Sequence, residues 1–276
     1  MTLQVRNLVK LFDGVPAVRD VSFEIGVGEC VALIGPNGAG KSTTFACIAG
    51  QQSPSLGEVL WAGKRIDCLS PAQRLRLGVA RTFQVAQTFE ALTVLQNVQL
   101  LLQAPLGLAA WKVLDHVQIE AARALLDRVG LQNLAAADVR SLPYGAKKRL
   151  ELALALAGIR AAQPDSGARL LLLDEPAAGL AGNERASLMA LVKSLANEVH
   201  HKTGANDFGG GVAVLYTEHN MDAVFGVADR VLVLIEGQLV AQGSASEVAQ
   251  NELVRTRYLG RAGHAALSGH GAGEGH

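Results

Sequence analysis

Cysteine, aromatic residues and long apolar runs are all scarce in this 276-residue sequence. The three cysteines, Cys30, Cys47 and Cys68, show no paired spacing, which is typical of a reducing compartment and argues against a cysteine metal site. No run approaches the ~18 consecutive apolar residues of a membrane span, and the closest, Leu150–Ile159, is short. The first residues alternate instead of following the basic-then-apolar order of an export signal. We therefore expect a chain that does not itself cross a bilayer.

Charge is scarce as well, and it is balanced. Charged side chains make up 18% of the residues, with 25 basic and 25 acidic, whereas apolar residues make up 49%. This balance gives no reason to expect nucleic acid as a partner. At ~100–200 residues per domain, the length allows one large domain or two small ones.

Short apolar segments alternate with helical ones along most of the chain. The runs Leu3–Leu8 and Val21–Ile25 predict strands joined by a turn. Continuous apolar runs predict strands buried on both faces, and these are Glu29–Gly35, Arg169–Glu175 and Gly211–His219. Helices are predicted at Lys41–Ala49 and Gly182–Val199, and a hairpin turning at Glu236-Gly237 follows.

A helical block interrupts this alternation. Residues Leu92–Leu102, Val113–Val129 and Arg149–Ile159 carry apolar side chains at three and four spacing. Together with the strands, this block predicts an α/β domain with a helical subdomain at approximately residues 90–160. The tail after Arg261 consists mostly of Gly, Ala, Ser and His, and we expect it to be disordered.

Residues 35–42, GPNGAGKS, match the pattern Gly, four residues, Gly-Lys-Ser/Thr, with a buried strand before them and a helix after them. Such a loop points backbone N–H groups inward, so it cradles a polyphosphate. Lys41 is expected to reach the β and γ phosphates, and Ser42 to ligate Mg²⁺. The alternative is a glycine-rich turn with a surface lysine, and this pattern arises by chance in roughly one such chain in a hundred. The predicted nucleotide loop comprises Gly35, Asn37, Gly38, Ala39, Gly40, Lys41, Ser42 and Thr43.

Two further buried strands end in polar residues. Leu170–Leu173 is followed by Asp174, expected to hold the magnesium shell through water, and by Glu175, expected to orient and activate the attacking water. An acidic helix N-cap is the alternative for this pair. His219 ends the other strand, where an imidazole can donate to a γ-phosphate oxygen; the alternative is a buried histidine satisfied by a carbonyl.

With these elements in this order, the chain resembles the nucleotide-binding subunit of ABC transporters. Two more stretches match family motifs: VARTFQ, with Gln84 as the Q-loop glutamine, and SLPYGAKKRLELALAL, the signature stretch. The resemblance covers residues 3 to about 260. It implies a P-loop NTPase domain at residues 1–261, with an N-terminal antiparallel β subdomain, a RecA-like core and a helical signature subdomain, followed by a disordered tail at residues 262–276.

Finer features resemble the ATPases of the branched-chain amino-acid branch, whose members carry leucine, isoleucine and valine, urea or short amides. These features are ARTFQ, the Tyr-Gly of the signature, DEPAAGL, the TEHNMDAV stretch and a terminal YLG. Phe12 sits where the family places an aromatic ring against adenine. A hydrophobic core position is the alternative for Phe12.

The resemblance also implies partners. Two copies, or this chain and a second ABC ATPase, would sandwich two ATP molecules with Mg²⁺, each signature closing the other subunit's site. Gln84 would link the γ-phosphate, Mg²⁺ and the helical subdomain, and helices of two transmembrane permease subunits would dock near it. A periplasmic solute-binding protein would act indirectly. The chain would then lie peripherally on the cytoplasmic face of a bacterial inner membrane.

The signature departs from the usual Leu-Ser-Gly-Gly-Gln, since it reads Leu142, Pro143, Tyr144, Gly145 and Ala146. The serine and glutamine side-chain contacts are missing, which leaves the Gly145 N–H, the helix dipole and the Tyr144 hydroxyl. At about 1.5–3 kcal/mol per lost charge-assisted bond, the site that this signature completes would be tenfold or more slower. Ala181 replaces the usual aspartate after the acidic pair, so communication across the dimer has no assigned residue.

Other interpretations remain open from sequence. One alternative is a soluble ABC protein that acts on a nucleoprotein, although such proteins usually carry two such domains, or a coiled-coil or zinc insert, in one chain. The other is a non-hydrolysing nucleotide switch, which the weakened signature suggests.

The basic residues Lys147, Lys148 and Arg149 fit a solvated first helical turn better than membrane headgroups. His264, His270 and His276 are too widely spaced in a glycine-rich segment to predict a defined metal site.

Overall fold

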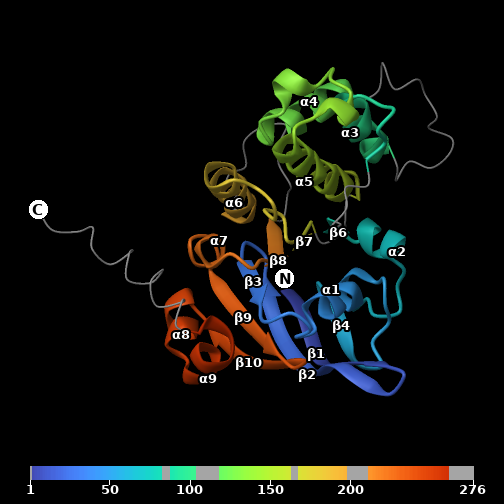
Figure 1. Ribbon diagram of the computed structural model, residues 1–276. Coiled ribbons are helices and arrows are strands. Elements are labelled where there is room, and N and C mark those ends of the chain that lie inside the picture. The colour runs from blue at the N-terminus through green and yellow to red at the C-terminus, as the bar shows by residue number, and fades with distance from the viewer. Residues whose placement is uncertain (1, 83–87, 104–117, 163–166, 198–210, 261–276) are drawn as a thin grey trace, which may run out of the picture.

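The computed structural model describes residues 2–82, 88–103, 118–162, 167–197 and 211–260. Gln84 and the three histidines of the tail lie outside these segments, and so do the end of the predicted helix Gly182–Val199 and the start of Val113–Val129. The described part comprises a four-stranded sheet, a six-stranded sheet and a group of helices (Figure 1).

The first sheet is antiparallel and runs in the order β2-β1-β4-β5. Its strands are β1 (Thr2–Phe12), β2 (Val15–Gly26), β4 (Leu56–Trp61) and β5 (Lys64–Arg65). The alternation of β1 is imperfect because Asn7 adopts a positive φ of 47° and the pairing with β2 shifts register between Val5 and Leu8. This irregularity buries Leu8 on the same side as Leu3 and Val5, so the strand keeps its apolar face.

The second sheet is parallel except for one edge strand and runs in the order β10-β9-β3-β8-β7-β6. Its strands are β3 (Cys30–Ile34), β6 (Val79–Arg81), β7 (Arg169–Asp174), β8 (Val212–Thr217), β9 (Arg230–Ile235) and β10 (Gln238–Gly243). Every residue of β3, β7 and β8 is buried, as the continuous apolar runs predict. Because these strands are parallel, their carboxyl ends meet at one edge.

Helix α1 (Lys41–Ala49) lies between the two sheets. Its apolar side chains, Phe45, Cys47 and Ile48, share one buried cluster with residues of β1 and β2 and with one face of β3, β7 and β8. The helix ends at Gly50, in a left-handed conformation, as predicted. The phosphate loop that precedes α1 is therefore anchored at both ends in the core.

The remaining helices cover the opposite face of the six-stranded sheet or its edges. They are α2 (Pro71–Arg76), α3 (Val94–Gln103), α4 (Ile119–Arg128), α5 (Tyr144–Ala162), α6 (Gly182–Asn197), α7 (Met221–Phe225), α8 (Ala245–Gln250) and α9 (Glu252–Val254), with a π-helical turn at Arg255–Leu259. Helices α3, α4 and α5 form the helical block at the top of Figure 1. The predicted fold class is confirmed.

Helix α5 begins five residues earlier than the predicted Arg149. The contacts of Lys148 and Arg149 also correct the prediction that these two side chains lie on a solvated turn. Lys148 is 5% exposed and pairs with Glu151 at 3.2 Å, so it does not lie on a solvated turn. Arg149 donates to the carbonyl oxygen of Val129 and to Ser187 Oγ. Lys148 is thus paired within its own helix, and Arg149 joins α5 to other parts of the fold. Among the described residues, none of the helices is long and apolar enough to cross a bilayer.

Candidate active site

The phosphate loop leaves the end of β3 and turns into α1. Gly35 has a φ of 149°, and a Cβ there would lie 2.0 Å from the Leu234 carbonyl oxygen, so only glycine fits. Gly38 also has a positive φ, 79°, but a Cβ there would meet nothing within 4 Å. Asn37, Gly38 and Ser42 are exposed, so the outer surface of the loop and the first hydroxyl of α1 are open to a ligand.

Lys41 is buried within the loop that it follows. Its Nζ donates to the carbonyl oxygens of Gly35 at 2.7 Å and Pro36 at 3.1 Å, and the residue is 7% exposed. Burial lowers the pKa of the Lys41 ammonium, whereas Glu175 and Asp174 act in the opposite direction. The lysine therefore lies in the field of both acidic residues at the sheet edge, as the motif order predicts.

Asp174 ends β7 and is held on both carboxylate oxygens. Oδ1 accepts from Thr217 Oγ1 at 2.7 Å, because Thr217 lies opposite Asp174 in the pairing of β7 and β8. Oδ2 accepts from Arg81 Nη2 at 2.6 Å, in an ion pair whose side chains are 12% and 4% exposed. Neither partner was assigned from sequence, although Arg81 lies in the ARTFQ stretch and Thr217 precedes Glu218. Arg81 and Thr217 fix the orientation of the carboxylate.

Glu175 follows in a turn, which corrects the alternative that the acidic pair caps a helix. Its φ is 48°, a conformation that costs energy for a non-glycine residue and is typical of functional sites. The Glu175 N–H donates to Thr217 Oγ1 at 3.0 Å, and Oε1 lies 2.9 Å from His219 Nε2. The His219 side chain is 46% exposed, so the alternative of a buried histidine is wrong. The structure thus brings Glu175 and His219 together, with Lys41 and Asp174 beside them.

Glu218 is a third residue that sequence reasoning missed. It is 4% exposed, and its carboxylate accepts the N–H of Ala177 at 2.9 Å and that of His219 at 3.2 Å. It therefore ties the turn after Glu175 to the end of β8. Burial raises the pKa of Glu218, and the two N–H groups partly oppose this rise. The available signal was an acidic residue next to His219 at the end of a buried strand.

Replacing Glu218 should loosen the Glu175–His219 pair. Alanine leaves the buried N–H of Ala177 and the partly buried N–H of His219 unpaired, so we expect kcat for ATP hydrolysis to fall about tenfold. Glutamine keeps one acceptor and should lose less. The pKa of Glu218 is raised in the folded state above its unfolded-state value of ~4.3. Below ~4.3 the carboxyl group is protonated in both states and costs no stability. The cost is largest above the raised pKa, where the folded protein holds a buried charge. The thermal midpoint of Glu218→Gln relative to wild type should therefore rise with pH across that window. Parallel pH profiles for the two proteins would contradict this.

The signature residues lie at the start of α5. Leu142 is buried, Pro143 is exposed, and Tyr144 is the first helical residue, followed by Gly145 and Ala146. The Tyr144 hydroxyl donates to the Ala178 carbonyl oxygen of its own chain at 3.1 Å. The hydroxyl is thus bonded within its own chain, and its contact with the nucleotide of a partner stays a prediction.

Phe12 lies at the end of β1 and is 43% exposed, so the alternative that it is a core residue is wrong. Lys10 Nζ lies 5.2 Å from the centre of its ring. The ring is thus partly exposed at the surface, and adenine stacking stays a prediction.

The site fits Mg²⁺ through oxygen ligands. Within the described segments no group of three or more His, Cys, Asp or Glu side chains could hold a metal alone. Mg²⁺ in phosphate sites keeps water and phosphate ligands and takes one or two protein oxygens. Ser42 can supply one directly, and Asp174 can hold one of the waters. The donor chemistry therefore agrees with a metal that arrives with a nucleotide.

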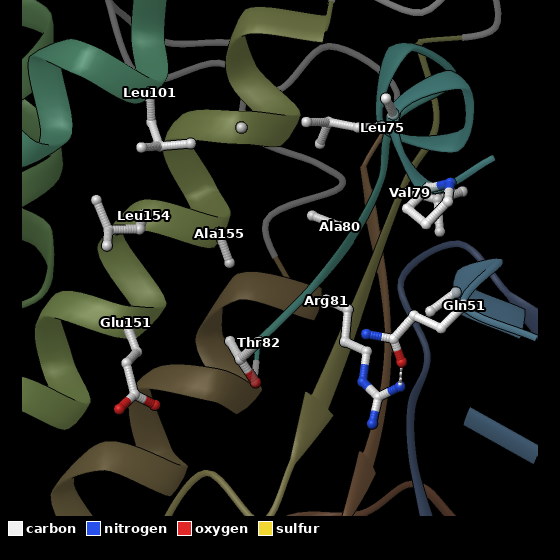
Figure 2. A pocket seen from close by; sticks show the side chains of 14 residues that line it. Gln51, Leu75, Val79, Ala80, Arg81, Thr82, Leu101, Glu151, Leu154 and Ala155 are labelled. Carbon is white, nitrogen blue, oxygen red and sulfur yellow. Dashed lines mark hydrogen bonds between the residues drawn. The ribbon is translucent and has the colours of Figure 1, made fainter. Parts of the chain in front are cut away.

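A separate pocket of about 290 Å³ lies between α2, β6 and α5 (Figure 2). Its wall is mainly apolar, with Leu75 on one side and Leu154 and Ala155 on the other. The polar residues of the wall include Glu151 and Arg81, and Arg81 faces Gln51 in Figure 2 and donates to its amide oxygen. Thr82, two residues before Gln84, lines the same pocket.

A family model described as ABC transporter matches residues 18–178, which span the phosphate loop, the signature and the acidic pair. The chain belongs to the ABC transporter family. It is therefore an ATP-binding cassette of the ABC ATPase type, and the prediction made from the motifs is confirmed.

This cassette is similar along nearly its whole length to ATP-binding proteins of known transporters. It is 36% identical over 269 residues to the high-affinity branched-chain amino acid transport ATP-binding protein LivG of Salmonella typhimurium, covering 94% of this chain and 98% of LivG. It is 33% identical to BraF of Pseudomonas aeruginosa, a protein with the same description, over 94% and 98% of the two chains. It is 32% identical to the lipopolysaccharide export system ATP-binding protein LptB of Escherichia coli, over 94% and 97%.

Solved structures place the cassette in the same fold. The ADP conformation of MJ1267, an ATP-binding cassette of an ABC transporter, matches with a TM-score of 0.77 and 28% identity, covering 95% of this chain and 100% of that one. A nucleotide-free ATP-binding cassette matches with a TM-score of 0.73 and 27% identity, covering 97% and 99%.

Proposed function

We propose that this cassette hydrolyses ATP to energise an ABC importer for branched-chain amino acids or a related small polar solute such as urea or an amide. The observation that carries the solute class is the 36% identity to LivG over 98% of that protein's length. The pairing of Glu175 with His219 beside the phosphate loop supports hydrolysis over a non-hydrolysing switch.

Each site residue then has a role. The loop amides from Gly35 to Thr43 would cradle the phosphates, with Lys41 leaving its two carbonyl partners for the β and γ phosphates. Glu175 would orient and deprotonate the attacking water, and His219 would hold the γ-phosphate. The Phe12 ring would stack on adenine.

Magnesium would be held by Ser42 directly, by Asp174 through water and by Gln84. When bound, it neutralises charge on the transferred phosphoryl group. The protein's contribution is to keep the Asp174 carboxylate fixed between Arg81 and Thr217.

The signature would complete the site of a second subunit. Tyr144 of the signature contacts Ala178 of its own chain, while Asn37 and Gly38 of the phosphate loop are exposed. ATP that binds a closed pair of subunits better than an open one shifts the pair closed, and hydrolysis releases it. The second subunit is another copy of this chain or a related cassette.

The pocket between α2 and α5 is the proposed docking place for a cytoplasmic helix of one permease subunit. The same pocket of the second cassette would take a helix of the other permease subunit. The pocket is apolar, it lies beside Thr82 two residues before Gln84, and its walls come from both the core and the helical block. The cassette would thus work at the cytoplasmic face of the inner membrane, with residues 1–261 as one nucleotide-binding domain and residues 262–276 as an appended tail. A periplasmic solute-binding protein would act through the permeases.

Reconstitution tests this proposal directly. The purified cassette should release phosphate from ATP in a magnesium-dependent manner. In proteoliposomes with its permease subunits and binding protein, it should drive uptake of labelled leucine or, failing that, labelled urea. Nucleotide binding without phosphate release would favour the switch. ATP hydrolysis stimulated by a nucleoprotein instead of by the loaded binding protein would favour the other ABC class.

A further inference from the structure

Tyr144 joins the signature helix to the loop that follows the catalytic glutamate. Its hydroxyl donates to the Ala178 carbonyl oxygen at 3.1 Å. Its ring lies so close to Gly179 that a Cβ there would be 3.0 Å from Tyr144 Cε1, and the φ of Gly179 is 77°. Glycine at 179 thus lets an aromatic ring pack directly on the loop backbone. The usual signature has glycine at the position of Tyr144, which cannot make this contact.

Two more contacts run along the same side of α5. A Cβ at Gly145 would lie 3.0 Å from Glu184 Oε1, so the first turns of α5 and α6 are closely packed. One turn further along, Arg149 Nη2 donates to Ser187 Oγ at 2.8 Å. Residues 144, 145 and 149 of α5 therefore form a brace against residues 178–187, which we call the α5 brace.

The ring of Tyr144 is also held from its own helix. Lys148 Nζ lies 5.9 Å from the ring centre, and Lys148 is in turn paired with Glu151 at 3.2 Å. The ring therefore has an ammonium of its own helix and the backbone of Gly179 as neighbours.

The far end of the brace reaches the backbone of Glu175. The Ala178 N–H donates to the Glu175 carbonyl oxygen at 3.1 Å, within the turn that gives Glu175 its positive φ. Ala178 therefore accepts from Tyr144 and donates to Glu175. A shift of this turn is passed to the first residue of the signature helix, although Pro143, Ala146 and Ala181 lack the side chains that usually connect the two sites.

We propose that Tyr144 is a positioning residue that makes the catalytic loop of one subunit and the signature it offers to the other subunit move as one unit. This inference rests on the proposed function, because it requires an ATP-dependent pair of cassettes. The link between the two nucleotide sites is then an aromatic side chain of the signature.

The test compares Tyr144→Phe, which removes one hydroxyl, with Tyr216→Phe as a matched control. Tyr216 is buried in β8, and its hydroxyl lies 3.4 Å from the carbonyl oxygens of Ala223 and Val224, away from the brace. We expect Tyr144→Phe to lower kcat by about five- to tenfold, while the Michaelis constant and the affinity for a fluorescent ADP analogue stay within twofold. In a Glu175→Gln background, it should also raise the dissociation constant of the ATP-bound dimer about tenfold, measured by sedimentation. Tyr216→Phe should change none of these values.

The outcomes separate this inference from the proposed function. An unchanged kcat in Tyr144→Phe overturns the link, and so does a lower kcat with an unchanged dimer, because the residue then acts only on its own loop. Parallel losses of kcat and ADP affinity would indicate general loosening and also overturn it. A wild-type cassette without ATPase activity, or a Glu175→Gln variant that never dimerises with ATP, would contradict the proposed function instead. Gly179→Ala, which adds a Cβ against the ring, should reproduce the effects of Tyr144→Phe.

Discussion

Replacing Glu175 with glutamine is expected to abolish ATP hydrolysis and to leave ATP binding intact. The carboxylate lies 2.9 Å from His219 and is the base proposed to activate a water molecule. Glutamine has nearly the same shape but cannot accept the proton, so kcat should fall by about a hundredfold or more. With ATP and Mg²⁺, the variant should accumulate as a stable dimer that elutes early in size-exclusion chromatography.

A second glutamate-to-glutamine change provides the control. Glu252 is exposed in the first turn of α9, and its replacement should leave phosphate release unchanged. Phosphate release by Glu175→Gln at the wild-type rate would show that another group activates the water. The assignment of the catalytic base would then have to be abandoned.

Alanine at Gly35 is expected to destabilise the fold more than alanine at any exposed position of the phosphate loop. The new Cβ would lie 2.0 Å from the Leu234 carbonyl oxygen, which belongs to the neighbouring strand β9 and cannot move without disturbing the sheet. We expect a loss of about 3–5 kcal/mol in the free energy of unfolding, or failure to fold at all.

Gly38→Ala is the matched comparison, because Gly38 also has a positive φ but a Cβ there meets nothing within 4 Å. Backbone strain alone should cost roughly 1–2 kcal/mol. Urea denaturation followed by tryptophan fluorescence gives both values. Equal losses of unfolding free energy at the two positions would mean that the close approach of Gly35 to β9 does not contribute to stability.

Much of the fold could be predicted because its strongest determinants are local. The apolar run at Cys30–Ile34, the glycine-rich loop and the helix that ends at Gly50 follow one another in sequence, and the structure has the helix with the predicted bounds. The hairpin turn at Glu236-Gly237 is equally local. Parallel pairing then brings Asp174 beside Thr217 without further information from sequence.

The parts that could not be predicted depend on contacts between distant segments. Arg81 and Asp174 are far apart in sequence, and nothing in ARTFQ indicates an ion pair with the end of another strand. Lys148 looked like a solvated charge because its side chain becomes buried only when α5 packs against the core. The hydrogen bond from Tyr144 to Ala178 likewise joins residues far apart in sequence, and no local pattern indicates it.

The three cysteines differ in a way that has practical value. Cys30 and Cys47 are buried, and burial raises the pKa of the Cys30 thiol to about 12 and also raises that of Cys47, so neither forms the reactive thiolate at neutral pH. Cys68 is exposed, just after the antiparallel sheet. A maleimide dye added to the native cassette should therefore attach at one known position, which supplies a fluorescent reporter without engineering the sequence.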